Sequence, residues 1–120
     1  MVTQAPDNGF TAQKDKIIFQ SGRQILFIDI EKITFIEACN YYALIHAGGK
    51  TLVVRQTLDE IEQRLASHSF LRVHRSVILN LNIFQCMERK DNKLIVRTTI
   101  GRDFKISRHR VKAIRSKILG

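Results

Sequence analysis

The fold of this chain is decided by the stretch Phe70-Leu71-Arg72-Val73-His74-Arg75-Ser76-Val77-Ile78-Leu79-Asn80. Six of its side chains are apolar, and three are strong hydrogen-bond donors: Arg72, His74 and Arg75. Because a charge is not buried without a partner, we expect the apolar residues to anchor the segment while the donors reach outward. A segment built in this way presents cationic groups from a fixed base. Its expected recipient is an anionic surface.

The chain has 120 residues, 44% of them hydrophobic, which suits one domain with one core. No run of about 18 apolar residues occurs, so no transmembrane helix is expected. The first fifteen residues lack the apolar region of a signal peptide. Cys39 and Cys86 have neither metal-ligand nor redox-motif spacing. We therefore expect a cytoplasmic protein in which both cysteines are free and act as small hydrophobes.

Positive charge is concentrated in the second half of the chain. Residues 1–67 hold 7 Lys/Arg and 8 Asp/Glu, a net charge of −1, whereas residues 68–120 hold 13 and 3, a net charge of +10. A field this lopsided attracts polyanions and speeds their encounter. A basic surface that only keeps the protein soluble is the alternative. Membrane binding is disfavoured, because no Trp is present and the last predicted helix offers only aliphatic anchors.

Residues 1–15 have no periodicity and predict a flexible tail or interdomain linker, with an ordered domain over 16–120. Turn signals at short intervals indicate a mostly antiparallel β domain. The expected strands are 17–19, 25–28, 33–38, 41–47, 51–54, 83–87, 93–98 and 102–106. Phe19, Phe27, Phe35 and Phe104 lie in such runs and are expected in the core. Tyr41 and Tyr42 alternate along a strand, so only one of them is expected to be exposed.

Two helices interrupt the strands. Thr57 and Glu60 fit a capping box, and Leu58, Ile61 and Leu65 then form an apolar stripe. The second helix is expected over 107–119, with Ser107 as its N-cap and Val111, Ile114 and Ile118 buried. Its first turn carries Arg108, His109 and Arg110, which oppose the helix dipole. A bound phosphate would relieve that conflict, and a mismatch screened by salt is the alternative.

Motifs follow one another in a specific order: Ile36-Glu37-Ala38 and Tyr42, the apolar positions from Leu58 to Leu65, Phe70-x-Arg72-Val73-His74-Arg75-Ser76-x-Ile78-Leu79-Asn80-Leu81-x-Ile83, Gly101, and Ser107-Arg108. This order resembles the LytTR DNA-binding domain, the output domain of response regulators, over nearly the whole chain from about Lys16 to Leu119. The resemblance implies an elongated, antiparallel, β-sandwich-like fold of about ten short strands with two short helices. It also implies sequence-specific binding of double-stranded DNA by a bacterial transcription regulator. Loops would read successive major grooves of tandem repeats.

The resemblance implies that residues of three segments contact DNA bases. The connection after the first motif points to Asn40, Tyr41 or Tyr42, and the central segment points to Arg75. The segment after Ser107-Arg108 points to His109, with Arg110 as its competitor. The guanidinium of Arg75 suits the O6 and N7 acceptors of guanine. The expected phosphate contacts are Arg72, His74, Ser76, Ser107, Arg108, Lys112 and Arg115. His74 has an equally good alternative as a structural donor, and a structural role is favoured for Asn80.

Two other classes compete with this interpretation. An RNA or single-strand binder would stack bases on exposed aromatic residues of a sheet. An enzyme would need clustered catalytic groups, but the four histidines are dispersed and no phosphate-binding glycine loop occurs. We therefore expect no enzyme, no metal and no cofactor. The expected partners are promoter DNA with direct repeats, a second copy on that DNA, and a receiver or sensor domain.

Overall fold

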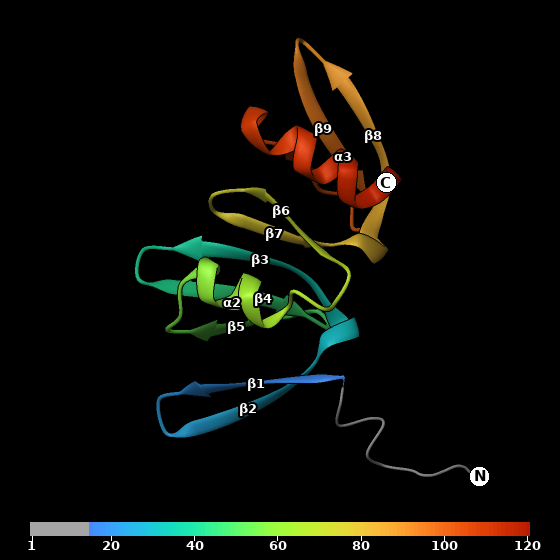
Figure 1. The fold of residues 1–120 in the computed structure, drawn as a ribbon. Helices are drawn as coiled ribbons and strands as arrows, with labels where there is room; N and C mark the ends of the chain where they lie inside the picture. Colours follow the sequence, from blue (N-terminus) through green and yellow to red (C-terminus); the bar gives the residue numbers. More distant parts are fainter. Residues whose placement is uncertain (1–14) are drawn as a thin grey trace, which may run out of the picture.

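A computed structural model describes residues 15–120, and within them the chain forms ten strands and two α-helices (Figure 1). The strands are β1 (Lys16–Ser21), β2 (Gln24–Asp29), β3 (Ile33–Cys39), β4 (Tyr42–Ala47), β5 (Lys50–Val54), β6 (Phe70–His74), β7 (Val77–Asn80), β8 (Phe84–Lys90), β9 (Lys93–Thr98) and β10 (Asp103–Lys105). The helices are α2 (Leu58–Arg64) and α3 (Val111–Leu119), and the 3₁₀ turns are η1 (Ile30–Lys32), η2 (Leu81–Ile83) and η3 (Arg108–Arg110). The mainly β fold class is confirmed. The expected N-terminal tail lies, except for Asp15, outside the described residues.

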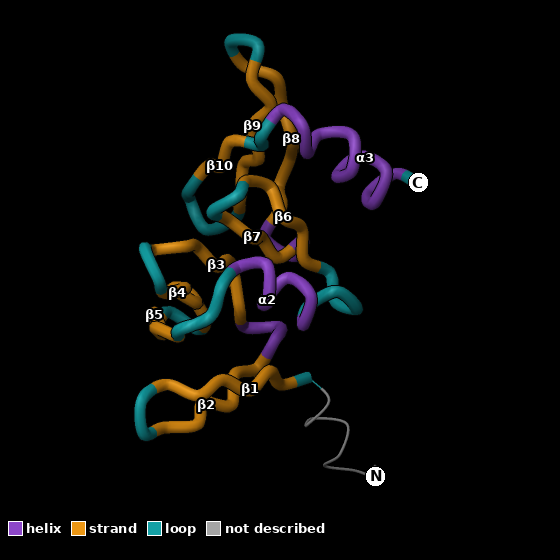
Figure 2. The backbone as a smooth tube through the Cα atoms, turned by 60° about the vertical axis from the view of Figure 1, so that its left-hand side comes forward, coloured by secondary structure: helices purple, strands orange, loops and turns teal. Residues whose placement is uncertain are grey.

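The strands pair antiparallel in three sheets, in the orders β1-β2, β5-β4-β3-β7-β6 and β10-β9-β8. The five-stranded sheet lies in the middle, between the β1–β2 hairpin and the β8–β10 sheet with α3 (Figures 1 and 2). The resulting molecule measures 49 × 35 × 25 Å, so the expected elongated shape is confirmed. The β3–β4 and β6–β7 turns lie on the same side of it, at the left of Figure 1.

The central sheet has an apolar cluster on each face, because successive side chains of a strand point to opposite sides. Ile36 of β3 is paired with Ile78 of β7, and both belong to the cluster that includes the buried side chains of α2 and of β1–β2. Phe35 is paired with Leu79, and both belong to the cluster that includes β9, β10 and α3. The two strands β3 and β7 therefore form a wall shared by two cores.

Helix α2 begins as the sequence predicts. The Thr57 hydroxyl accepts a hydrogen bond from the Glu60 amide at 3.1 Å, and the Glu60 carboxylate accepts one from the Thr57 amide at 2.9 Å. The pKa of Glu60 is lowered by the Thr57 amide first and by the Thr57 hydroxyl second. The predicted stripe is buried, with Leu58, Ile61 and Leu65 at most 4% exposed. The capping box thus fixes α2 against the sheet.

The C-terminal helix begins later than predicted. Residues 108–110 form a 3₁₀ turn, and the α-helix begins at Val111. The Ser107 side chain makes no capping hydrogen bond, so its expected capping role is wrong. Ile114 is buried as expected and Val111 is partly buried, but Ile118, in the last turn of α3, is 37% exposed at a surface depression beside Met87 and Leu94.

Three aromatic residues are more exposed than the sequence predicts. Tyr41 is 82% exposed in the β3–β4 turn, and Tyr42 is 45% exposed at the open end of the ladder, opposite Cys39. Phe27 is 62% exposed, because its neighbours Leu26 and Ile28 take the inward positions of β2. Phe19, Phe35 and Phe104 are buried as expected.

Cys39 and Cys86 are free thiols, as expected, but both are exposed and neither is a core residue. Over residues 15–120, no helix has the length and apolar character needed to cross a membrane. No group of three or more potential metal ligands occurs in the same span.

Candidate nucleic-acid interface

Two backbone hydrogen bonds gather the three predicted contact segments at one edge of the central sheet. The amide of Ala38, near the end of β3, donates to the carbonyl of Ser76 in the β6–β7 turn at 2.9 Å. The amide of Ser107, just before η3, donates to the carbonyl of Val73 in β6 at 2.8 Å. The β6–β7 turn is therefore attached to the β3–β4 segment on one side and to the η3 segment on the other.

A hollow lies on each side of the β6–β7 turn. The first hollow is bounded by the β3–β4 turn, the residues before α2 and the first turn of α2. Its polar and aromatic side chains include Asn40, Tyr41, Tyr42, Arg55, Gln56, Arg72 and Arg75, and the acidic side chains of Asp59 and Glu60 line it as well. The second hollow is bounded by the β8–β9 hairpin, β10 and η3; its side chains include His74, Arg75, Arg89, Lys93, Lys105, Ser107, Arg108 and His109. Residues from all three predicted segments thus line two adjacent hollows.

Arg75 is common to both hollows. Arg75 is exposed, and its side chain makes no hydrogen bond or ion pair within residues 15–120. The polar groups around it are, in contrast, occupied. His74 Nδ1 lies 3.2 Å from the Ser76 amide and 2.8 Å from the Ser76 hydroxyl. A turn held by internal hydrogen bonds therefore presents the exposed Arg75 guanidinium between two concave surfaces.

His74 and Ser76, both predicted phosphate contacts, are hydrogen-bonded to each other. Because the Ser76 amide donates to Nδ1, the neutral His74 ring carries its proton on Nε2. The structural alternative for His74 is therefore realised in the turn. Its ring also lines the second hollow, where Nε2 remains a donor.

Arg72 lines the first hollow, but its side chain has partners within the protein. The side chain is only 7% exposed, and Nη1 contacts the carboxylates of Asp59 at 2.9 Å and Glu62 at 2.8 Å. Its Nε donates to the His74 carbonyl at 2.9 Å, and its Nη2 donates to the Arg75 carbonyl. Both donor edges of Arg72 are therefore engaged within the protein, and its phosphate contact stays a prediction.

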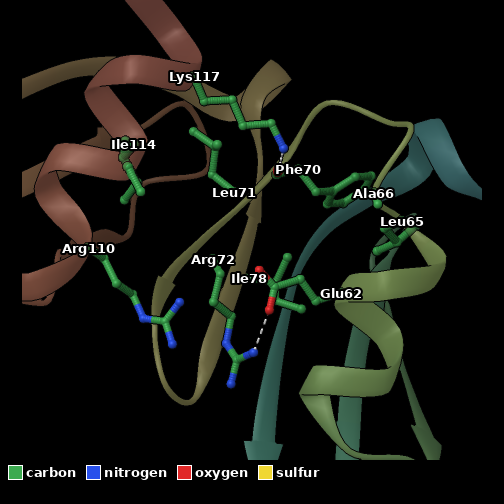
Figure 3. A pocket seen from close by; sticks show the side chains of 11 residues that line it. Glu62, Leu65, Ala66, Phe70, Leu71, Arg72, Ile78, Arg110, Ile114 and Lys117 are labelled. Carbon is green, nitrogen blue, oxygen red and sulfur yellow. Dashed lines mark hydrogen bonds and ion pairs between the residues drawn. The ribbon is translucent and has the colours of Figure 1, made fainter.

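Arg110 points away from the second hollow. Its side chain enters a cavity between α2 and α3 that Arg72 and Lys117 also line (Figure 3). Its buried Nε has no hydrogen-bond partner within the described part of the chain. Of the two competing readers after Ser107-Arg108, His109 lines the second hollow and Arg110 does not. This placement favours His109.

The remaining predicted contacts are at the surface. Arg108 and His109 are exposed in η3, and Lys112 and Arg115 are exposed on α3. Arg115 lies beside Met87 and Leu94, at a separate depression. Asn80 is buried, as its structural interpretation requires, and its amide donates to the Ile33 carbonyl at 2.8 Å.

Sequence reasoning missed several cationic and polar residues of the two hollows. Arg55 and Gln56 precede α2, whereas Arg89, Lys93 and Lys105 lie in strands of the β8–β10 sheet. None of them belongs to a motif with its own spacing. For Arg89, Lys93 and Lys105 the charge excess after residue 67 was the available signal, but it did not distinguish them from their solvent-exposed neighbours. No signal in the sequence pointed to Arg55 and Gln56.

These features define an all-β domain with a cationic, hollowed edge formed by connecting segments. A solved LytTr DNA-binding domain of a putative methyl-accepting/DNA response regulator from Bacillus cereus has the same fold, with a TM-score of 0.75. The match covers 88% of this chain and 98% of that chain at 20% sequence identity.

The family model of the LytTr DNA-binding domain matches residues 23–119, and the chain belongs to this family. The family is one of DNA-binding domains. The family is not one of enzymes.

Two curated relatives are considerably longer than this chain. The sensory transduction protein LytT of Bacillus anthracis is 32% identical over 72 residues, which make up 60% of this chain and 29% of that protein. The CO-responsive transcriptional regulator RcoM of Rhodospirillum rubrum is 28% identical over 102 residues, which make up 83% of this chain and 43% of that protein. The chain therefore spans less than half the length of these relatives.

Proposed function

We propose that this domain binds double-stranded DNA sequence-specifically, with Arg75 as its principal base reader. The observation that carries the proposal is the position of Arg75, which is shared by two hollows and is without a protein partner over residues 15–120. A guanidinium in the major groove can bond both acceptors of guanine, and each bidentate contact discriminates by about 1–3 kcal/mol. Asn40, Tyr41 and Tyr42 would contact bases from the first hollow, and His109 from the second.

Arg108, Lys112 and Arg115 are proposed phosphate contacts, and Arg89, Lys93 and Lys105 join them from the β8–β10 sheet. Such contacts fix the orientation of the duplex without reading sequence. The two hollows lie on either side of the β6–β7 turn and share Arg75, so we propose that the segments that line them enter neighbouring major grooves of tandem repeats. One copy, or two copies on neighbouring repeats, would then bind such a site.

The relatives supply the proposed context. One is named as a sensory transduction protein and another as a CO-responsive transcriptional regulator, and both are much longer than this chain. We take this domain to be the output part of such a regulator, which acts in the cytoplasm, where the DNA is, and answers to a sensor or receiver domain.

The test begins with selection of duplexes from a random DNA library by the 120-residue chain. The affinity of the selected duplex and of a shuffled duplex is then measured for Arg75→Ala. We expect Arg75→Ala to weaken binding of the selected duplex by about 1–3 kcal/mol and to leave the shuffled duplex nearly unchanged. Lys112→Ala should weaken both duplexes alike, because it removes a phosphate contact.

Lys50→Ala is the matched control for charge. Lys50 is exposed beside the β4–β5 turn, at the opposite end of β4 from Tyr42, so its loss should change both affinities little. Equal losses on selected and shuffled DNA for Arg75→Ala would overturn its role as a base reader. The absence of any enriched duplex would overturn sequence-specific binding.

The competing class is a single-strand or RNA binder, and the exposure of Tyr41, Tyr42 and Phe27 keeps it worth testing. Stacking on such residues would make binding depend on them rather than on Arg75. Competition between the selected duplex and its separated strands or the matching RNA distinguishes the two classes. We expect the duplex to compete best.

A further inference from the structure

The β6–β7 turn has an irregular ladder just before Arg75. Arg72 is paired with Ile78, but His74 is paired with Val77, so one extra residue is accommodated in β6. Bulges of this kind redirect a side chain and leave local backbone groups without ladder partners. Here the carbonyls of His74 and Arg75 receive the Arg72 guanidinium instead.

The same guanidinium reaches α2 with its remaining edge. Its Nη1 contacts the carboxylates of Asp59 and Glu62 in the first and second turns of the helix. Its Nε and Nη2 donate to carbonyls of the β6–β7 turn, which carries Arg75 and is called the reading turn below. The forked, planar geometry of arginine allows these four contacts at once, and the point charge of lysine does not. Both carboxylates are partly exposed, at 84% and 47%, so the pair is accessible to mutation without opening the core.

We infer that Arg72 is a positioning residue that ties the DNA-reading turn to α2, and that Glu62 and Asp59 hold it in place. This inference rests on the proposed function of Arg75. Arg72 would not touch DNA; it would determine the height and direction of the Arg75 backbone. Loss of the tie would leave the attraction between the cationic surface and DNA intact but lower the discrimination between sequences.

Glu62→Ala tests the positioning role, because general electrostatics and positioning predict opposite changes in affinity for the selected duplex. Its loss raises the net charge by one unit above +9, so electrostatics alone predicts tighter binding of every duplex. The positioning role predicts that affinity for the selected duplex falls by about tenfold relative to the shuffled duplex. Glu31→Ala is the matched control, because Glu31 is exposed in η1, at the opposite end of β3 from the reading turn.

Arg72→Lys complements this variant, because it keeps the charge and removes the fork. We expect the same loss of selectivity, an unchanged dependence of shuffled-duplex affinity on salt, and faster amide exchange at Arg75 and Ser76 by NMR. A lysine in a phosphate contact would also keep the salt dependence, but any loss of affinity would then be equal on the selected and the shuffled duplex, because phosphate contacts do not read sequence. Circular dichroism verifies folding, and if Arg72→Lys does not fold, Glu62→Ala decides alone.

The outcomes separate this inference from the proposed function. Retained selectivity in Glu62→Ala and Arg72→Lys, with selectivity lost in Arg75→Ala, would overturn the positioning role and leave Arg75 as the reader. Retained selectivity in all three variants would overturn the proposed role of Arg75 itself. Loss in all three, with Glu31→Ala unchanged, is the result that we expect.

Discussion

At the scale of single residues, one motif combines recognition with construction. Arg75 projects from the β6–β7 turn without a partner in the described chain, whereas Asn80, five residues later, is 5% exposed and fully engaged. The Asn80 amide donates to the Ile33 carbonyl at 2.8 Å, and its side-chain oxygen accepts from the Asn82 amide at 3.0 Å. Asn80 thereby joins the end of β7 to the start of β3.

We expect Asn80→Ala to lower the free energy of unfolding by about 2 kcal/mol, because it leaves a buried carbonyl and an amide without partners. Urea denaturation measures this loss, and Asn82→Ala is the control, since its exposed side chain makes one long contact at 3.4 Å. A loss no larger than that of the control would contradict the structural assignment of Asn80.

Arg72 shows why the residue scale is only partly predictable. Its charge indicated an outward position, because a charge is not buried without a partner, and the family resemblance suggested a phosphate contact. Its burial depends on carboxylates that are 10 and 13 residues earlier in the chain, on a helix whose position the local pattern does not contain. The exposure of both Tyr41 and Tyr42 similarly results from the place where the hairpin ends.

At the scale of secondary structure, local patterns were more reliable. Apolar runs bounded by turn signals located all eight predicted strands but missed β6 and β7, and the capping box located the start of α2 to the residue. The last helix was misplaced at its beginning because residues 108–110 form a 3₁₀ turn. Three residues per turn, rather than 3.6, change the direction of the following side chains. Arg110 consequently faces the cavity beside Arg72 instead of the second hollow.

We expect Thr57→Ala to destabilise the domain by about 1 kcal/mol at neutral pH through the loss of the N-cap. The lowered pKa of Glu60 adds a pH dependence with a definite sign. Its contribution is fully present above the carboxyl's unfolded pKa and is lost as pH falls through the lower, folded pKa. Thermal unfolding of both proteins from neutral to acidic pH should show the difference between them shrinking. A constant difference would contradict the reciprocal cap.

At the scale of the whole molecule, charge and shape cooperate. Six cationic residues are the proposed phosphate contacts: Arg89, Lys93, Lys105, Arg108, Lys112 and Arg115. If each neutralises one phosphate, log K for shuffled duplex DNA should fall with log salt concentration with a slope of roughly −5. Titrations at several salt concentrations measure it. A slope near zero would contradict this surface as the one that meets the backbone.

The wall formed by β3 and β7 has a consequence for truncation of the domain. Phe35 and Leu79 face one core, and Ile36 and Ile78 face the other, so neither half retains a covered interior after the other is removed. A fragment that ends between the two halves would carry one face of the wall bare to water, where apolar side chains of neighbouring copies would adhere to it.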